Sequence, residues 1–181
     1  MRSSIAAINE EMKLDDGEFI VSKTDIKGRI TYANRVFMEI SQYPEDQLLG
    51  IQHNIIRHPD MPRGVFRLLW NTIETGQEFF GFVKNLCADG RYYWVFANVT
   101  AEYDEQGKLT GYLSVRRKPP QKAIDAVMPI YAEMLDIEKN SSSKKSAPDE
   151  SIAYLVQQVE GMKTNYQSLV LALFNDYSES L

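Results

Sequence analysis

The stretch EFFGFVKNLCADGRYYWVFANVTAEYDEQGKLTGYLSVRR, residues 78–117, decides the fold. It contains three runs rich in aromatic and β-branched residues, EFFGFVKNL, RYYWVFANVTAEY and KLTGYLSVRR. Short turns at Asp89–Gly90 and Gln106–Gly107 separate these runs. Runs of this composition joined by short turns predict three antiparallel strands in a meander.

A hairpin is predicted upstream of the meander. The sequence changes to a period of two in FIVSKTD (19–25) and RITYAN (29–34), and Lys27–Gly28 lies between them as a turn. Asn34 then stands directly before RVFMEIS (35–41), whose apolar residues share one helical face. We therefore expect Asn34 to cap a short helix.

Helices of two lengths are predicted between the hairpin and the meander. The segment 43–62 is polar and interrupted by prolines and a glycine, which favours turns and single-turn helices. From Pro62 to Thr75 apolar residues recur at helical spacing, and Gly76 follows as a stop. The complete order predicts an α+β fold, a five-stranded antiparallel sheet with helices over one face. Such an arrangement leaves a pocket between the two layers.

The N-terminal residues 1–16 are predicted to form an amphipathic helix that precedes the predicted α+β domain at 17–118. Ile5, Ile8 and Met12 follow one another at spacings of three and four, which is typical of one apolar helix edge. This short helix is expected to act as a cap on the domain.

The C-terminal third of the chain is predicted to be helical on both sides of a linker. Residues 119–139 form a connecting helix in which Pro129 is expected to produce a kink or a restart. Residues 140–150 are a polar linker. Residues 151–181 carry apolar side chains at intervals of four and three, a packed helical seam. This seam has two readings, an interface for a second copy or another partner, or packing against the chain's own domain.

Composition excludes several functional classes. In a chain of 181 residues the net charge is −5, which provides no broad cationic field for nucleic acid. The single cysteine, Cys87, cannot form an intrachain disulfide, and one thiol with two histidines does not make a common zinc site. No apolar run approaches the roughly 20 residues that span a bilayer. We therefore expect a soluble cytoplasmic protein that reaches the inner membrane face only through a partner.

A family resemblance rests on HNIIRHPDMP (53–62), followed by Trp70 and by Val83-Lys84-Asn85. Together with the element order, these residues resemble the flavin-binding PAS domain of aerotaxis receptors and of their PAS-only relatives in energy taxis. The similarity extends from about Gly17 to Leu135. It implies noncovalently bound FAD whose redox state reshapes the domain surface. Because this sequence lacks the receptor's membrane anchor and signalling domain, the expected partner is a separate membrane chemoreceptor.

The chemistry of an isoalloxazine ring selects the first candidate site residues. The ring needs an apolar slot, a flat packing surface, and directional partners for its pyrimidine edge. Trp70 on the long helix offers the flat surface, and the Asn85 amide offers both a donor and an acceptor. As structural alternatives, Trp70 fills the core and Asn85 bonds a neighbouring loop.

Charged and polar residues complete the predicted site. His53, Arg57 and His58 lie on the loop that faces the slot, where a cation stabilises reduced flavin or binds the pyrophosphate. Asp60 is predicted to orient one of them, although Arg57 and Asp60 also fit a loop salt bridge or a helix cap. Two further candidates are Asn34, a polar contact, and Arg116, placed either at the flavin edge or at the exit of the signal.

Two other functions compete with the flavin sensor. The histidines His53 and His58 suit a haem-binding PAS gas sensor, although the helix over 62–75 contains no histidine. A cofactor-free PAS dimerisation module is the third possibility. Cys87 is interpreted as a structural residue and not as a photochemical one. An enzyme is not expected, because the sequence shows no nucleophile motif, phosphate loop or metal cluster.

Overall fold

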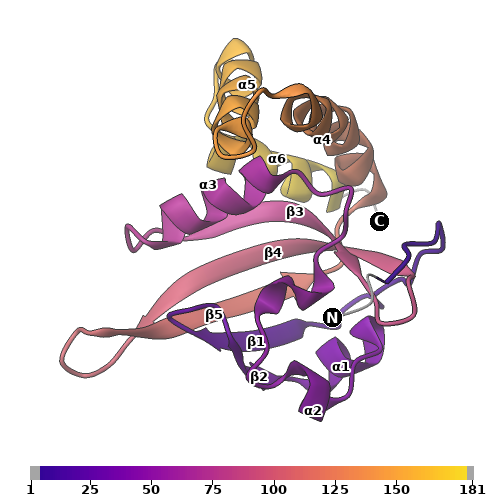
Figure 1. The fold of residues 1–181 in the computed structure, drawn as a ribbon, viewed down its shortest axis with the longest axis vertical. Helices are drawn as coiled ribbons and strands as arrows, with labels where there is room; N and C mark the ends of the chain where they lie inside the picture. Colours follow the sequence, from indigo (N-terminus) through magenta and orange to yellow (C-terminus); the bar gives the residue numbers. More distant parts are fainter. Residues whose placement is uncertain (1–4, 179–181) are drawn as a thin grey trace.

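The structure is a computed structural model that describes residues 5–178. Five antiparallel strands form one sheet in the order β2-β1-β5-β4-β3. Figure 1 shows this sheet as a curved layer through the middle of the molecule. The strands are β1 (Ile20–Asp25), β2 (Ile30–Ala33), β3 (Phe79–Leu86), β4 (Tyr92–Tyr103) and β5 (Leu109–Arg117). The predicted hairpin, meander and α+β PAS fold are thereby confirmed.

The helices fall into two groups. The first group packs against one face of the sheet and consists of α1 (Arg35–Ser41), α2 (Glu45–Leu48), the 3-10 helix η1 (His53–Ile56) and α3 (Arg63–Ile73). The second group gathers beyond β3 and α3 and consists of α4 (Gln121–Asn140), α5 (Ala147–Gly161) and α6 (Tyr166–Ser178). No helix in residues 5–178 is long and apolar enough to cross a membrane.

The alternation of side chains in β3 and β4 explains how the two groups share the sheet. In register, Val83 lies opposite Val95 and Asn85 opposite Tyr93, and all four face α3. Phe82 and Phe96 are likewise paired, but they lie on the opposite face of the pleat. Buried aromatic residues on both faces account for the near-continuous apolar pattern of these strands.

The second group of helices covers the outer face of β4 and the free edge of β3. Phe174 of α6 stacks on Phe96 with ring centroids 4.2 Å apart, and Tyr131 of α4 stacks on Trp94 at 6.5 Å. The Tyr131 hydroxyl donates to the Phe82 carbonyl at 2.8 Å. The buried seam residues belong to this packing. Packing against the chain's own domain therefore accounts for the buried part of the seam, and a partner interface over 151–181 stays a prediction.

The predicted N-terminal helix over 1–16 is wrong for the described residues, and residues 1–4 lie outside them. Residues 5–16 contain no helix and run beside the start of β4. The Met12 amide donates to the Tyr92 carbonyl at 2.7 Å, and the Tyr92 amide donates to Glu10 at 3.0 Å. Pairing between β4 and β5 stops at Phe96, so Tyr92 has backbone groups available on that side. These hydrogen bonds override the helical spacing of Ile8 and Met12.

The C-terminal boundaries also differ in detail from those predicted. Pro129 lies inside the continuous helix α4, which does not restart there. The linker is shorter than 140–150, because α5 already begins at Ala147 with Pro148 in its first turn. The predicted helix over 151–181 is interrupted between α5 and α6, where Lys163 has a φ of 57°.

Candidate functional site

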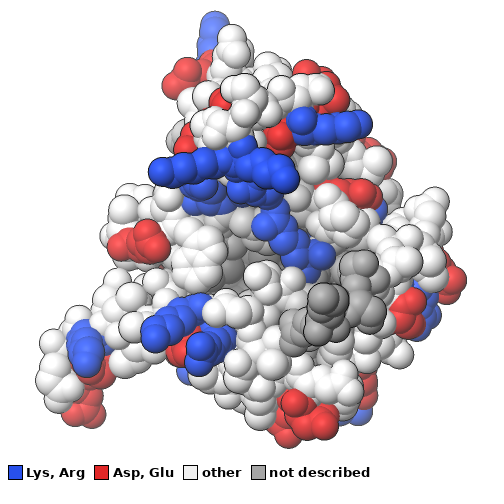
Figure 2. All heavy atoms as spheres, in the orientation of Figure 1, with Lys and Arg blue, Asp and Glu red and all other residues white. Residues whose placement is uncertain are grey.

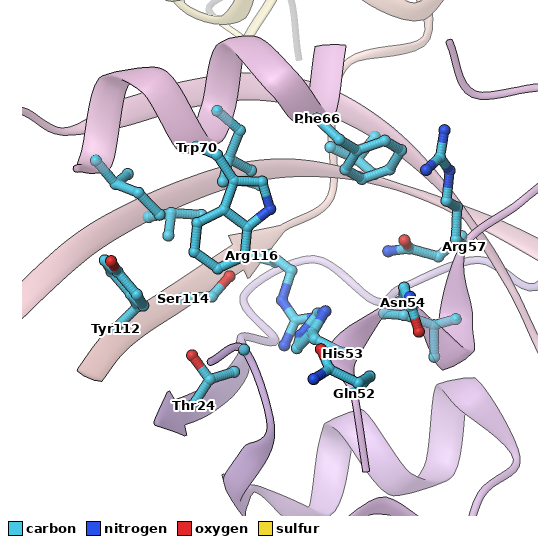
Figure 3. A pocket seen from close by; sticks show the side chains of 18 residues that line it. Thr24, Gln52, His53, Asn54, Arg57, Phe66, Trp70, Tyr112, Ser114 and Arg116 are labelled. Carbon is cyan, nitrogen blue, oxygen red and sulfur yellow. The ribbon is translucent and has the colours of Figure 1, made fainter. Parts of the chain in front are cut away.

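A cavity of about 140 Å³ lies between α3 and the sheet. Its walls come from α3, from strands β1, β3, β4 and β5, from the β1–β2 turn and from residues 52–57. Five predicted site residues line it together: His53, Arg57, Trp70, Asn85 and Arg116. Figure 3 shows Trp70 and Arg116 directed toward the same space from α3 and β5.

The helical wall is apolar because one face of α3 presents Phe66, Leu69, Trp70 and Ile73 at helical spacing. Trp70 remains 36% exposed, so it is not a core-filling residue. Its indole meets Tyr112 edge to face at a centroid distance of 5.3 Å. The Trp70 side chain therefore closes the cavity while one part of it faces solvent.

Trp70 also contacts the turn between β1 and β2. Gly28 in this turn has a φ of +75°, and a Cβ atom there would lie 3.4 Å from the indole of Trp70 and from Oε1 of Gln52. The positive φ favours glycine, and the close approach leaves little room for a side chain. Trp70 thus joins α3 to the hairpin at the entrance of the cavity.

The wall formed by β3 and β4 is apolar except for Asn85. Its apolar residues are Val83, Ala97 and Val99. Asn85 is only 4% exposed, and its backbone forms a bridge with Arg57 that fixes the loop to the strand. Opposite Asn85 on β4, the side chain of Tyr93 is fully buried. The Asn85 amide and the Tyr93 hydroxyl therefore make one end of this otherwise apolar wall polar.

The polar end of the cavity contains an incompletely bonded cation. Arg116 is 2% exposed, donates one hydrogen bond to Ser22 at 2.6 Å, and lies over the Phe37 ring at 4.4 Å. Its Nε and Nη1 have no hydrogen-bond partner. Burial lowers the Arg116 pKa to about 10. Among residues 5–178, no Asp or Glu lines the cavity, so the guanidinium charge is not compensated by a described carboxylate there.

His53 is held neutral beside this cation. Burial, followed by the charge of Arg116, lowers its pKa to about 3. The Ser22 hydroxyl accepts from Arg116 and lies 3.2 Å from Nε2 of His53, within hydrogen-bonding distance. His53 therefore contributes a dipole and a flat surface, and no charge, near neutral pH.

Arg57 lies at the rim of the cavity. Its Cζ atom stands 4.4 Å from the centroid of the Phe66 ring, and burial lowers its pKa. Arg67 lies on the side of α3 that faces α5, where it pairs with Asp149, and is not part of this rim. Figure 2 shows Lys and Arg side chains gathered over α3. This rim is suited to the anionic part of a ligand whose apolar part enters the cavity.

The remaining predicted site residues do not line the cavity. Asn34 caps α1 through the Phe37 amide and also bonds strand β1 at the Val21 amide, which confirms the cap. His58 is buried, whereas Asp60 pairs with Lys84 at 2.7 Å on the surface. His58 accepts from the Asp60 amide at 3.1 Å. His58 and Asp60 therefore fasten the loop to β3, the structural alternative considered for Asp60.

Sequence reasoning did not identify several lining residues. Phe66 and Ile73 lie four positions before and three positions after Trp70, so helical spacing alone contained this information. Likewise, Ser114 and Tyr112 share the face of β5 that carries Arg116. Ser22 and Tyr93 had no comparable signal, because their positions depend on the register between separate strands.

The geometry disfavours an axial histidine for haem. Nε2 of His53 is engaged by Ser22, and a metal ion on that ring would face the neighbouring Arg116 cation. His58 lies outside the cavity lining. Among residues 5–178, no group of three or more His, Cys, Asp or Glu side chains is arranged to hold a metal ion.

Comparison with known sequences agrees with the fold. A family model described as the PAS fold matches residues 30–116. The aerotaxis receptor of Escherichia coli is 38% identical over 131 residues, which cover 72% of this chain and 26% of the receptor. The nitrogen fixation regulatory protein of Klebsiella pneumoniae is 30% identical over 104 residues, 58% of this chain and 21% of that protein. This chain thus spans about a quarter or less of the length of these relatives.

Solved structures agree as well. The blue-light photoreceptor Aureochrome1 LOV in its light state superposes with a TM-score of 0.52 at 25% identity, covering 68% of this chain and 91% of that one. A light-oxygen-voltage domain studied with a flavin analogue superposes with a TM-score of 0.54 at 21% identity, covering 61% and 83%. The chain contains a PAS domain, which includes residues 30–116.

Proposed function

We propose that this protein is an FAD-binding redox sensor for energy taxis that signals by contact with another protein. The similarity to an aerotaxis receptor supports the taxis role. The choice of flavin as the cofactor rests on the family resemblance of the segment 53–62 and on the chemistry of the cavity. Bound flavin would supply reversible electron transfer.

The observation that carries the proposal is the cavity itself, with apolar walls and an uncompensated Arg116 at one end. Trp70 would hold the flat ring, and the Asn85 amide would satisfy its pyrimidine edge. Nε and Nη1 of Arg116 supply two further donors. Arg57 at the rim would hold the phosphates. These residues match the polarity and charge of a flavin nucleotide.

The same geometry favours a sensor over an enzyme. His53 is neutral and bonded to Ser22, and Arg116 retains its proton, so neither is placed to act as a general base near neutral pH. The positive charge of Arg116 instead makes the cavity respond to added negative charge. We propose that the response passes to a membrane chemoreceptor at the inner membrane face of the cytoplasm, or to a second copy of the chain.

The test is an absorption spectrum of the purified protein, recorded in air and again after dithionite. We expect flavin bands that bleach on reduction, and release of FAD on heating. A Soret band would assign the cavity to haem. A colourless protein that takes up no added FAD would overturn the proposal in favour of a cofactor-free module.

A further inference from the structure

Helix α3 stands between the cavity and the C-terminal helices. Phe66 and Trp70 on one side line the cavity, whereas Gly64 and Arg67 on the other side meet α4 and α5. A movement of α3 therefore changes both the cavity and the contact with α4 and α5. This position connects ligand binding to a surface that the cavity does not touch.

Glu138 of α4 supplies the missing N-terminal cap of α3. Helix α3 has Pro62 at its N-cap position and no side-chain cap of its own. The Glu138 carboxylate accepts from the Arg63 amide at 2.9 Å and from the Gly64 amide at 2.7 Å. Ser151 of α5 donates to the same carboxylate at 2.7 Å. One side chain thus ties three helices together at the end of α3.

The packing around the Glu138 carboxylate is tight, so a small shift of α3 relative to α5 alters it. A Cβ atom at Gly64 would lie 2.2 Å from Oγ of Ser151 and 3.0 Å from the Pro148 carbonyl. At the rim of the same interface, Arg67 donates to both carboxylate oxygens of Asp149, at 2.8 and 2.9 Å. Hydrogen bonds at these distances weaken when α3 moves away from α5.

The cavity is small for a large ring. Its volume of about 140 Å³ compares with roughly 150 Å³ for an engineered cavity that holds a single benzene molecule. A tricyclic ring needs more room than this to be enclosed. A widening at the contact between Trp70 and Gly28, where α3 meets the β1–β2 turn, would supply more room. Opening that contact shifts α3 relative to the sheet and to its cap.

The negative charge of a bound ligand is expected to weaken the docking of α4 and α5 on α3, as the ligand's volume does. Arg57 stacks on Phe66 at the rim, and the negative charge of Glu138 favours its protonated form. An anionic group at the rim attracts the same guanidinium. An anion bound at the rim also repels the negatively charged Glu138 carboxylate.

We propose that the cavity and the docking of α4 and α5 on α3 are coupled through Glu138. Filling the cavity with a large anionic aromatic ligand weakens this docking, and docking in turn weakens ligand binding. The reciprocity follows from thermodynamic linkage between two sites that share one element. The C-terminal helices are thereby a readout of cavity occupancy, and their release is the signal that a partner detects.

Hydrogen exchange measured by mass spectrometry tests the coupling, with FAD as the ligand in accordance with the proposed function. On adding FAD we expect α4 and α5 peptides to exchange at least about threefold faster, while peptides of β4 and β5 remain protected. Glu138→Gln should accelerate α4 and α5 without FAD, and should lower the dissociation constant for FAD about fivefold. Glu133→Gln removes the same charge from an exposed position of α4 and should match the wild type.

Two results would overturn the coupling: α4 and α5 exchange that is unchanged by bound ligand, or a Glu138→Gln variant with wild-type affinity. Failure of the proposed function gives a different result, because the wild-type protein would then bind no FAD. In that event the aromatic anion 1-anilinonaphthalene-8-sulfonate replaces FAD as the probe. The same acceleration is expected with it, and its absence refutes the coupling.

Discussion

Replacing Arg116 by methionine should leave the protein without FAD at least as stable as the wild type, and should impair FAD binding. Burial lowers the Arg116 pKa from 12.5 to about 10. Since one pKa unit corresponds to about 1.4 kcal/mol, burial costs the guanidinium cation about 3 kcal/mol. The hydrogen bond to Ser22 and the contact with Phe37 offset about 2 to 3 kcal/mol of this burial cost. Methionine keeps most of the apolar volume and adds no unsatisfied donor.

FAD binding, in contrast, should be weaker in the Arg116→Met variant, because the variant loses the unpaired donors Nε and Nη1. A hydrogen bond to a charged group contributes about 1.5–3 kcal/mol, so we expect the dissociation constant to rise about 10- to 100-fold. Urea unfolding without FAD and fluorescence titration with FAD measure the two effects. Arg117→Met is the control, since Arg117 is exposed on the neighbouring position. A variant that loses more than about 2 kcal/mol of stability and binds FAD normally would show that Arg116 is structural.

Three further substitutions test other parts of the site. Trp70→Ala should lower the unfolding free energy by at most about 2 kcal/mol, because Trp70 is 36% exposed, yet should weaken FAD binding at least about tenfold in the same titration. Asn85→Leu keeps about the size of the side chain but removes both its donor and its acceptor, so FAD affinity should fall about tenfold. His53 has a pKa of about 3 in the folded state and about 6.5 unfolded, so the unfolded state binds the proton first. Stability is therefore lost as the pH falls below 6.5, by about 2 kcal/mol between pH 7 and pH 5, and His53→Asn should remove that loss in urea unfolding. An identical pH profile in both proteins would contradict the buried neutral state.

Local patterns were sufficient for most of the fold. Alternation and turn residues located the meander, and helical spacing together with Gly76 located α3. The N-terminal segment shows where local patterns fail. Ile8 and Met12 have helical spacing, but unpaired backbone groups of Tyr92 select an extended chain. Nothing within residues 5–16 reveals that β5 ends opposite Phe96.

The candidate site was predictable only where one element supplies the residues. Trp70 on α3 and Asn85 on β3 were placed correctly at the cavity. His58 and Asp60 belong to the same distinctive segment, but they secure it to Lys84 and do not line the cavity. The environment of Arg116 depends on the register of β1 with β5, which brings Ser22 close to it, and sequence periodicity does not specify that register.

The central claim is that Trp70 and Asn85 form opposite walls of a flavin site. A crystal structure of the chain grown with FAD tests it most directly. We predict the isoalloxazine ring between those two side chains, with its pyrimidine edge within hydrogen-bonding distance of Asn85 or Arg116. A ring bound elsewhere, or a cavity filled by protein side chains in the presence of saturating FAD, would contradict the claim.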